Sequence, residues 1–535
     1  MSGNLTPRVN TLRTSSNNDT SPLPSGMNTP SEEVQEHLAL AIAGEGSAVD
    51  ELSAAAKEMA LQDGENEDEA ETKEGKFKGL LSILRRFIGI KDLASVRFSL
   101  PAQFLEPIPN LDYWHYVDRP DALICITDPE EPVDRMLAVL RWWFTKDLKV
   151  VKGKPCKPYN CILGEFFRAH WDVREPAFNP DGTMLPANTD PHIPDDPPQS
   201  SASSIKSAKS ASTITSGGGS WKRAGFLSRR NTPQPTSGPT LTVPKVDYVP
   251  HSERKVCRVA YVTEQVSHHP PVSAYYASCA EKGIVMRGLD QVSAKFTGTS
   301  IKVFPGEQNR GVWITLKQRG DEEYLVTHTS ASVSGFLMGS PTINIHDASV
   351  ATCPKTKTKA IVQYLEESWL GKQKALVKGA IFTYDPANDN ITDFKDVPSS
   401  ALIGTIEGSW KGEVFYTPKD GVRRLLVDLE LFDVFPKKVP ESHELHPNES
   451  HRVWEGVTKS IKSSQFSKAT KLKVDIEERQ RAKAKKRLEE GTEHEVKLFK
   501  MPVGDGKPEL SQLGEKILAG VANADYGSMK DSIPE

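Results

Sequence analysis

The chain lacks the features that would place it outside the cell or across a membrane. Its 535 residues include only six cysteines, and these show no framework spacing, which is typical of a protein in a reducing compartment. No apolar run approaches the roughly 18 residues of a membrane-spanning helix. The N-terminal segment also lacks the apolar core of a signal peptide. We therefore expect a soluble, cytoplasmic chain.

A large excess of charge of either sign is missing as well. The formal net charge is −4, so the chain as a whole is not a nucleic-acid binder, and any basic site must be local. Hydrophobic residues make up 37%, below the roughly 45–50% that is usual for globular proteins. Part of the chain is therefore expected to lie outside a packed core.

Three segments fit that expectation by composition. Residues 1–75 are predicted to be disordered and include an acidic linker, and residues 176–250 form a predicted disordered Ser/Pro-rich insert. Residues 503–535 are predicted to be a loose C-terminal tail. Within the insert, two arginines at positions 229 and 230 precede Thr232, which makes Thr232 a candidate for modification by a kinase.

Two amphipathic helices are predicted before the first motif. In the first, basic residues flank apolar residues at helical spacing, so it is either a core-packing helix or a lid that faces a membrane. Its apolar residues are Phe77, Leu80, Leu81, Leu84, Phe87 and Ile88. The second is predicted over residues 132–150, with Pro132 near its start and Trp142 and Trp143 in the core or in a tunnel wall.

Residues 256–384 read as successive short β-rich runs separated by turn residues, and two further β segments follow. So many antiparallel strands must form a sandwich or close into a barrel, because open edges are a liability. After Pro440 the pattern becomes helical and ends in a long charged helix over residues 467–491.

Two adjacent histidines, His268 and His269, precede two prolines in the segment EQVSHHPP at 264–271. Because consecutive strand side chains point to opposite faces, the chain must bend at Pro270 if both rings are to act on one ligand. A metal site is disfavoured, since no set of Cys, Asp or Glu stands nearby at ligand spacing. An anion fits better, because a nearby phosphate favours the charged form of histidine.

Two further constellations carry cations and hydrogen-bonding groups. Lys157 and Asn160 suit a phosphate with adjacent hydroxyls, although an exposed lysine and a turn asparagine would look the same. Lys473, Glu477 and Arg481 are spaced i, i+4, i+8 and form one stripe on a helix. That stripe is either a salt-bridge ladder on a solvated face or a phosphate site in which the glutamate positions the cations.

Together these motifs resemble the oxysterol-binding-protein-related family. EQVSHHPP resembles its signature octapeptide, KPYNCILGE at 157–165 resembles its KPxNxxLGE segment, and KVDIEERQR at 473–481 resembles its C-terminal stripe. The resemblance implies a mainly β fold with α, in which a large incomplete antiparallel β-barrel surrounds a hydrophobic lipid tunnel. It also implies an N-terminal amphipathic lid, C-terminal helices and a lipid-binding domain over residues 76–502.

The resemblance further implies the ligands. Phosphatidylinositol 4-phosphate would be held at the tunnel mouth by Lys157, Asn160, His268, His269, Lys473, Glu477 and Arg481, and the lid would face the membrane. The second lipid is expected to be a sterol. Phosphatidylserine stays open, because SLPAQFLEP at 99–107 partly resembles a segment of phosphatidylserine carriers. Hiding several hundred Å² of hydrocarbon at about 25 cal/mol per Å² is worth on the order of 10 kcal/mol, so a tunnel makes such a lipid portable.

The implied function is exchange of the two lipids between organelle membranes by a peripherally associated protein. We expect no enzyme activity, no cofactor, no metal and no nucleic-acid partner. A phosphoinositide or sterol sensor, or an adaptor without net transfer, is the alternative. A lipid hydrolase is disfavoured because no nucleophile motif such as GxSxG is present.

Overall fold

The computed structural model describes residues 102–153, 156–179, 182–185, 253–335, 342–366, 374–527 and 532–533. By internal contacts the chain divides into units 1–55 and 56–535, and every described residue belongs to the second unit. The predicted lid at 77–88, the N-terminal region 1–75 and Thr232 lie outside the described residues and stay predictions.

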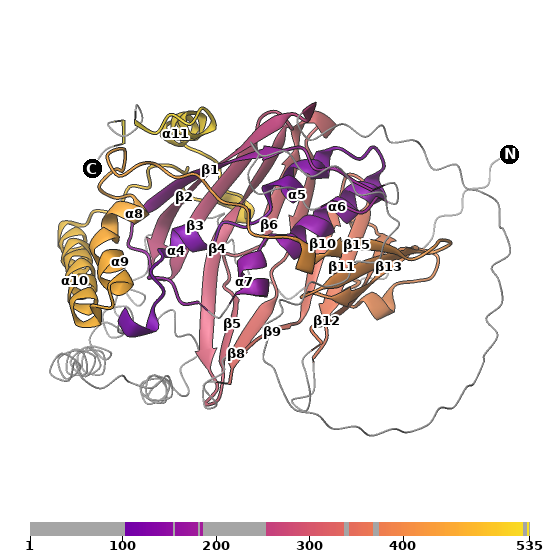
Figure 1. Cartoon of the computed structure of the whole chain (residues 1–535), viewed down its shortest axis with the longest axis horizontal. Helices are drawn as coiled ribbons and strands as arrows, with labels where there is room; N and C mark the ends of the chain where they lie inside the picture. The colour runs from indigo at the N-terminus through magenta and orange to yellow at the C-terminus, as the bar shows by residue number, and fades with distance from the viewer. Residues whose placement is uncertain are drawn as a thin grey trace, which may run out of the picture. The chain divides into compact units, whose positions relative to one another are not determined.

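The described strands form one 15-stranded antiparallel sheet (Figure 1). Its main path is β1-β2-β3-β4-β6-β7-β10-β11-β12-β13-β14-β15, and β5, β8 and β9 branch from β4. The strands are β1 Phe166–Arg174, β2 Val256–His268, β3 Pro271–Cys279, β4 Ile284–Phe296, β5 Ile301–Pro305, β6 Val312–Leu316, β7 Glu322–Val326, β8 Ser330–Ser334, β9 Thr342–His346, β10 Ala348–Cys353, β11 Thr358–Tyr364, β12 Leu376–Thr383, β13 Leu402–Ser409, β14 Glu413–Pro418 and β15 Arg424–Asp428. The predicted mainly β fold with many antiparallel strands and C-terminal helices is confirmed. Among the described strands the expected barrel is open, because β1 and β15 end the path and do not pair with each other.

Helices from the two ends of the described chain cover different parts of this sheet. They are α4 Asn110–Tyr113, α5 Pro120–Ile124, α6 Pro132–Thr145, α7 Leu148–Lys152, α8 Ser450–Val453, α9 Glu455–Lys462, α10 Phe466–Glu490 and α11 Gln512–Ala522. Helix α5 contacts β1, and α6 contacts β10, β11 and β15. None of the helices in the described part of the chain is long and apolar enough to cross a membrane.

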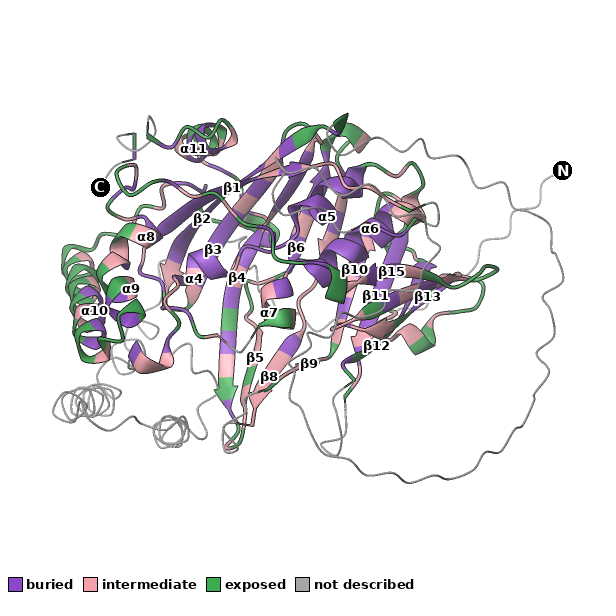
Figure 2. Cartoon of the chain, in the orientation of Figure 1, coloured by how far each residue is buried: buried purple, intermediate pink, exposed green. Residues whose placement is uncertain are grey.

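The main core lies between the N-terminal helices and the sheet. Burial alternates along β10, as expected when one face of a strand packs on the core, whereas β1 and β2 are buried on both faces (Figure 2). Trp142 and Trp143 are buried, as predicted, and Trp142 Nε1 donates to the Tyr116 carbonyl at 3.1 Å.

The helix predicted over 132–150 is two helices. Helix α6 begins at Pro132. Proline has no N–H, but the first residue of a helix makes no intrahelical hydrogen bond through its N–H, so nothing is lost there. It ends at Thr145, and Asp147 then adopts a non-helical backbone conformation before α7 begins at Leu148. The apolar spacing continues across this break, so the break cannot be predicted from periodicity alone.

Three stretches outside the predicted β runs belong to the fold. Strands β1 and β3 were not among the predicted runs, although β1 pairs along its whole length with β2. The insert was predicted to begin at 176, but Phe178 bridges Met184, and Met184 is buried in the main core.

The prediction of a loose tail after residue 503 is wrong for α11. Leu510, Ile517 and Val521 are buried in a second core against β2, and the Ser511 side chain caps the helix by accepting from the Gly514 N–H. Helical apolar spacing and the N-cap serine were visible in the sequence and could have revealed this helix.

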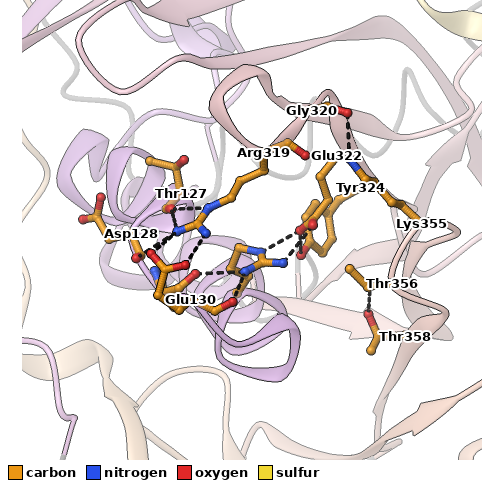
Figure 3. A network of polar contacts seen from close by, with 12 residues as sticks. Thr127, Asp128, Glu130, Arg319, Gly320, Glu322, Tyr324, Lys355, Thr356 and Thr358 are labelled. Carbon is orange, nitrogen blue, oxygen red and sulfur yellow. Dashed lines mark hydrogen bonds and ion pairs between the residues drawn. The ribbon is translucent and has the colours of Figure 1, made fainter.

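A polar network fastens the N-terminal helices to the β6–β7 turn (Figure 3). The buried Arg135 of α6 donates from Nε and Nη2 to both carboxylate oxygens of Glu322, at 2.7 and 2.8 Å. Tyr324 donates to the same carboxylate at 2.6 Å. On the surface nearby, Arg319 pairs with Glu130 and donates to the Thr127 carbonyl. The network thus fixes one end of α6 against the sheet.

Candidate functional site

Lys157 and Asn160 lie on an extended segment that joins the N-terminal and C-terminal parts of the described chain. The Glu106 N–H donates to the Lys157 carbonyl at 3.0 Å. The Tyr159 ring packs on Trp454, between α8 and α9, with ring centroids 5.0 Å apart. The backbone of the segment is therefore held on two sides, while the side chains of Lys157 and Asn160 stay exposed.

The ammonium group of Lys157 lies in a crowded setting although its side chain is reachable from solvent. Its Nζ donates to Asn160 Oδ1 at 2.7 Å and to the Pro158 carbonyl at 2.9 Å. Desolvation, and secondly the positive charge of Lys473, lower the pKa of Lys157 to about 8. Protein atoms therefore crowd the ammonium group while the side chain as a whole stays open to solvent. Two neighbouring cations in such a site favour an anionic ligand.

The stripe on α10 supplies the second cation. Lys473 is buried, and its Nζ donates to Glu477 Oε1 at 2.7 Å, while an Arg481 Nη2 lies 3.9 Å from the other oxygen of Glu477. One turn before Lys473, the Thr470 hydroxyl accepts from the Ala102 N–H at 3.1 Å. The predicted salt bridges within the helix are present. Lys473 is buried, however, so this end of the stripe does not lie on a solvated face.

The two histidines lie where the chain reverses between β2 and β3. Strand β2 ends at His268, the His269–Pro270 peptide is cis, and His268 pairs with Pro271 across the turn. The two rings are in edge contact, with centroids 4.7 Å apart. The chain bends as predicted, and both rings lie together instead of on opposite faces.

Backbone hydrogen bonds join the histidine segment to the Lys157 segment. The Gly164 N–H donates to the Gln265 carbonyl at 3.0 Å, and the Gln265 N–H donates to the Glu165 carbonyl at 2.8 Å. These two motifs therefore meet at the start of β1, and α10 packs on the Lys157 segment through a buried cluster that contains Tyr159 and Ile476. After desolvation, the charge of Lys473 is the next largest cause of the lowered pKa of Lys157, and His268 ends β2, the strand whose Gln265 is bonded to Gly164 and Glu165.

The family comparison agrees with these motifs. The oxysterol-binding protein family model matches residues 79–466. The chain belongs to the oxysterol-binding protein family. It is 40% identical over 506 residues to oxysterol-binding protein-like protein 1 of Schizosaccharomyces pombe, covering 88% of this chain and 95% of that protein. It is 28% identical over 402 residues to human oxysterol-binding protein-related protein 9, covering 75% of this chain and 44% of that longer protein.

Solved structures of the family share the fold. The Osh1 ORD domain in complex with cholesterol superposes with a TM-score of 0.53 at 16% identity, covering 89% of this chain and 99% of that domain. The Saccharomyces cerevisiae Osh3 ORD in complex with PI(4)P gives a TM-score of 0.50 at 16% identity, covering 84% and 94%. At such low identity these similarities establish the architecture alone.

Two buried carboxylates in the family motifs had no role in the sequence interpretation. Glu165 accepts from Ser450 Oγ at 2.6 Å and from Trp454 Nε1 at 3.0 Å. Glu264 accepts from the N–H groups of Lys497 and Leu498 at 3.0 and 2.7 Å. Burial raises the pKa of each carboxyl to about 7. Both residues fasten the C-terminal chain to the sheet. Only Glu264 lies within an apolar β run, where an acidic residue is a visible signal of a buried polar role.

A second polar cluster lies within the main core, away from the cationic site. Tyr116 donates to Asp290 Oδ1 at 2.7 Å, and its ring lies 5.4 Å from that of Tyr275 and 5.2 Å from that of His328. Desolvation raises the pKa of Asp290 to about 7 and lowers that of His328 to about 3, so His328 is uncharged at neutral pH and Asp290 is mostly protonated below pH 7. The Tyr275 hydroxyl and His328 Nε2 are buried without a hydrogen-bond partner among the described residues.

These side chains come from positions 116 to 328 and carry no shared sequence motif, so no pattern in the sequence indicates the cluster. Buried polar atoms are almost always hydrogen-bonded in folded proteins. Two unsatisfied atoms on rings that both contact Tyr116 therefore suit a hydroxyl group that belongs to a ligand or to water.

Proposed function

We propose that this family member is a lipid transfer protein that exchanges phosphatidylinositol 4-phosphate for a second lipid between membranes. The head group would be held by the seven residues predicted from the sequence. Phosphoinositide phosphates carry several negative charges, and a cage of cations and donors stabilises them through charge-assisted hydrogen bonds. The PI(4)P complex of the related Osh3 domain supports this choice of ligand.

One observation carries the head-group assignment. Tyr159 and Ile162 share one buried cluster with Ala469 and Ile476 of α10, so folding brings Lys157 and Lys473, more than 300 residues apart in sequence, onto packed neighbouring segments. Desolvation, and secondly the positive charge of Lys473, lower the pKa of Lys157. Folding brings two cations together at a cost, which a bound anion would offset. Lys473 is buried while Lys157 stays open to solvent, so the anion would enter from the Lys157 side.

The second lipid is proposed to be a sterol. A sterol has a single hydroxyl, and the nearly neutral cluster around Asp290 and Tyr116 offers partners for one such group within apolar surroundings. The phosphatidylserine head group carries three charges, and the same cluster would leave them poorly compensated. The cholesterol complex of the related Osh1 domain supports this cargo.

The proposed mechanism needs no covalent step, and the protein is not proposed to be an enzyme. Both lipids would compete for the same binding tunnel. A gradient of the phosphoinositide between two membranes can therefore drive the sterol against its own gradient. The protein would dock peripherally, release one lipid and accept the other.

Transfer between vesicles tests this function. Donor vesicles carry labelled sterol or labelled phosphatidylserine, and acceptor vesicles carry phosphatidylinositol 4-phosphate or none. Wild-type protein should move sterol faster when the phosphoinositide is in the acceptor, and a His268→Ala, His269→Ala variant should lose that acceleration. The matched control is His443→Ala, which changes a histidine that is 78% exposed.

The outcomes separate the candidate functions. If phosphatidylserine moves and sterol does not, the cargo assignment is wrong while exchange stands. If the protein binds the phosphoinositide but moves neither lipid at catalytic amounts, exchange is ruled out and the sensor or adaptor takes its place. Appearance of a cleaved lipid product would instead indicate a hydrolase.

A further inference from the structure

The C-terminal half of α10 is exposed on nearly all its sides among the described residues. The four buried residues of this helix, Ala469, Thr470, Lys473 and Ile476, all lie in its first half. From residue 478 onward nearly every position is exposed, whichever way it faces (Figure 2). Helices of globular proteins usually bury an apolar stripe along their length. The last three turns of α10 bury none among the described residues, so packing does not explain their sequence.

The C-terminal half of α10 is strongly basic, although the chain as a whole is acidic. Six cations and no acidic residue occur between positions 479 and 488, whereas the net charge of the chain is −4. Arg479, Lys483, Lys486 and Arg487 have the spacing i, i+4, i+7, i+8 and therefore share one side of the helix. These four residues, the basic stripe, are distinct from the Lys473–Arg481 stripe of the proposed head-group site.

The rest of the described protein does little to neutralise the basic stripe. Lys486 Nζ lies 3.6 Å from Glu490 Oε1, one turn further along the helix. An exposed ion pair of this kind neutralises the charge of the lysine only weakly. Arg479 Nε donates to the Asp475 carbonyl of its own helix at 3.2 Å. Favourable interaction with the helix dipole accounts for a cation in the last turn, such as Arg487, but not for Arg479 or Lys483 farther back.

We propose that the basic stripe docks the protein on an anionic phospholipid surface. An extended row of cations on an exposed helix complements a sheet of negative head groups, and each cation near such a surface strengthens binding about fivefold. Arg481 lies within the same turns of α10, so docking there would bring the proposed head-group site close to the lipid it takes up. This inference goes beyond the proposed exchange, because vesicle binding can be measured whether or not lipid moves.

The test is co-sedimentation of the full chain with phosphatidylcholine vesicles that contain or lack phosphatidylserine. The stripe variant carries Lys483→Gln, Lys486→Gln and Arg487→Gln, since glutamine and lysine have similar helix propensities. The control variant carries Lys378→Gln, Lys395→Gln and Lys419→Gln. These are exposed lysines around β12–β14, which lie at the other end of the sheet from α10 (Figure 1). Both variants lower the net charge by the same amount.

The stripe variant should bind anionic vesicles at least about tenfold more weakly than wild type, and the control should differ by less than about twofold. Wild-type binding should fall steeply as salt shortens the screening length, and binding to neutral vesicles should be unaffected by either variant.

Equal losses in the two variants would overturn the proposal, because net charge alone would then explain them. No loss in the stripe variant would overturn it as well. Wild-type affinity for a single-stranded oligonucleotide above that for anionic vesicles at the same ionic strength would assign the stripe to nucleic acid instead. If the wild type exchanges no lipid while the stripe variant loses vesicle binding, docking stands and the proposed exchange fails.

Discussion

In the candidate site, the surroundings of a single residue change its pKa and therefore its charge. Desolvation and the neighbouring Lys473 lower the pKa of Lys157 to about 8, so its ammonium group is only partly charged in mildly alkaline solution. Only the protonated form attracts a phosphate. We therefore expect affinity for phosphatidylinositol 4-phosphate vesicles to fall between about pH 7 and pH 9.

A Lys157→Arg variant tests the origin of that fall. Arginine stays protonated across this range, so the variant should bind with a flatter pH profile, even if its affinity at pH 7 is lower. An unchanged profile in the variant would show that another group controls binding. Equilibrium vesicle binding at constant ionic strength is the measurement.

Asp290 gives a second prediction, this time for stability. Burial raises its pKa from 3.8 to about 7 in the folded protein. Between those values the folded state keeps a proton that the unfolded state has lost, so this group makes stability fall as the pH rises from about 4 to about 7. An Asp290→Asn variant lacks this penalty. Relative to wild type, it should gain about 2–4 kcal/mol in the free energy of unfolding between pH 5 and pH 8.

Urea unfolding at a series of pH values measures that difference. Asp420→Asn, on the exposed β14–β15 turn, is the control and should show no such trend. If the two variants follow wild type equally at every pH, Asp290 does not titrate with a raised pKa.

At the scale of elements, buried carboxylates join segments that are far apart in sequence. Glu165 stands at the start of β1 and accepts from Ser450 of α8 and from Trp454. Removing it leaves those buried donors unpaired, each at about 1–3 kcal/mol. Glu165→Ala should therefore destabilise the protein by about 2–4 kcal/mol.

The same variant should loosen α8 and α9 before the rest of the fold. Hydrogen exchange should show faster exchange in these helices than in β10–β13. Glu455→Ala, which removes a partly exposed carboxylate on α9, should cost less than about 1 kcal/mol. Uniformly faster exchange across the sheet would contradict a local role for Glu165.

The network that holds α6 offers a matched pair of ion pairs (Figure 3). Glu322→Ala removes the buried partner of Arg135 and leaves an uncompensated charge, so it should cost about 3–5 kcal/mol in the free energy of unfolding. Glu130→Ala removes the carboxylate that pairs with Arg319 and is 81% exposed, and it should cost less than about 1 kcal/mol. Similar losses from the two variants in denaturant unfolding would show that burial is not what separates them.

At the scale of the whole molecule, the folded unit continues beyond the C-terminal boundary predicted at residue 502. Ile517 and Val521 of α11 are fully buried against the outer face of β2. Ile517→Ala should cost about 2–5 kcal/mol, because it loses buried contacts and leaves a cavity. Lys516→Ala, at the exposed neighbouring position, should be nearly neutral, and thermal or denaturant unfolding compares the two. If Ile517→Ala leaves the free energy of unfolding unchanged, residues 503–535 do not contribute to the folded unit and the prediction of a loose tail stands.

The sequence determined the family and much of the architecture. EQVSHHPP, KPYNCILGE and KVDIEERQR are contiguous motifs, and the long charged helix and the many β runs are local patterns. Local backbone preference and periodicity act over a few residues, so a single sequence can display them. The proline pair likewise predicts the reversal at His269–Pro270, and the regular spacing of a helix predicts the stripe on α10.

Tertiary structure decided what each motif residue contacts. Glu165 and Glu264 were visible in the motifs, but their partners lie about 230 to 290 residues away, and only the folded chain brings them together. The polar cluster of Tyr116, Tyr275, Asp290 and His328 likewise exists only because four distant segments enclose it. Burial sets the charge of such groups, and burial is a property of the packed molecule instead of the local sequence.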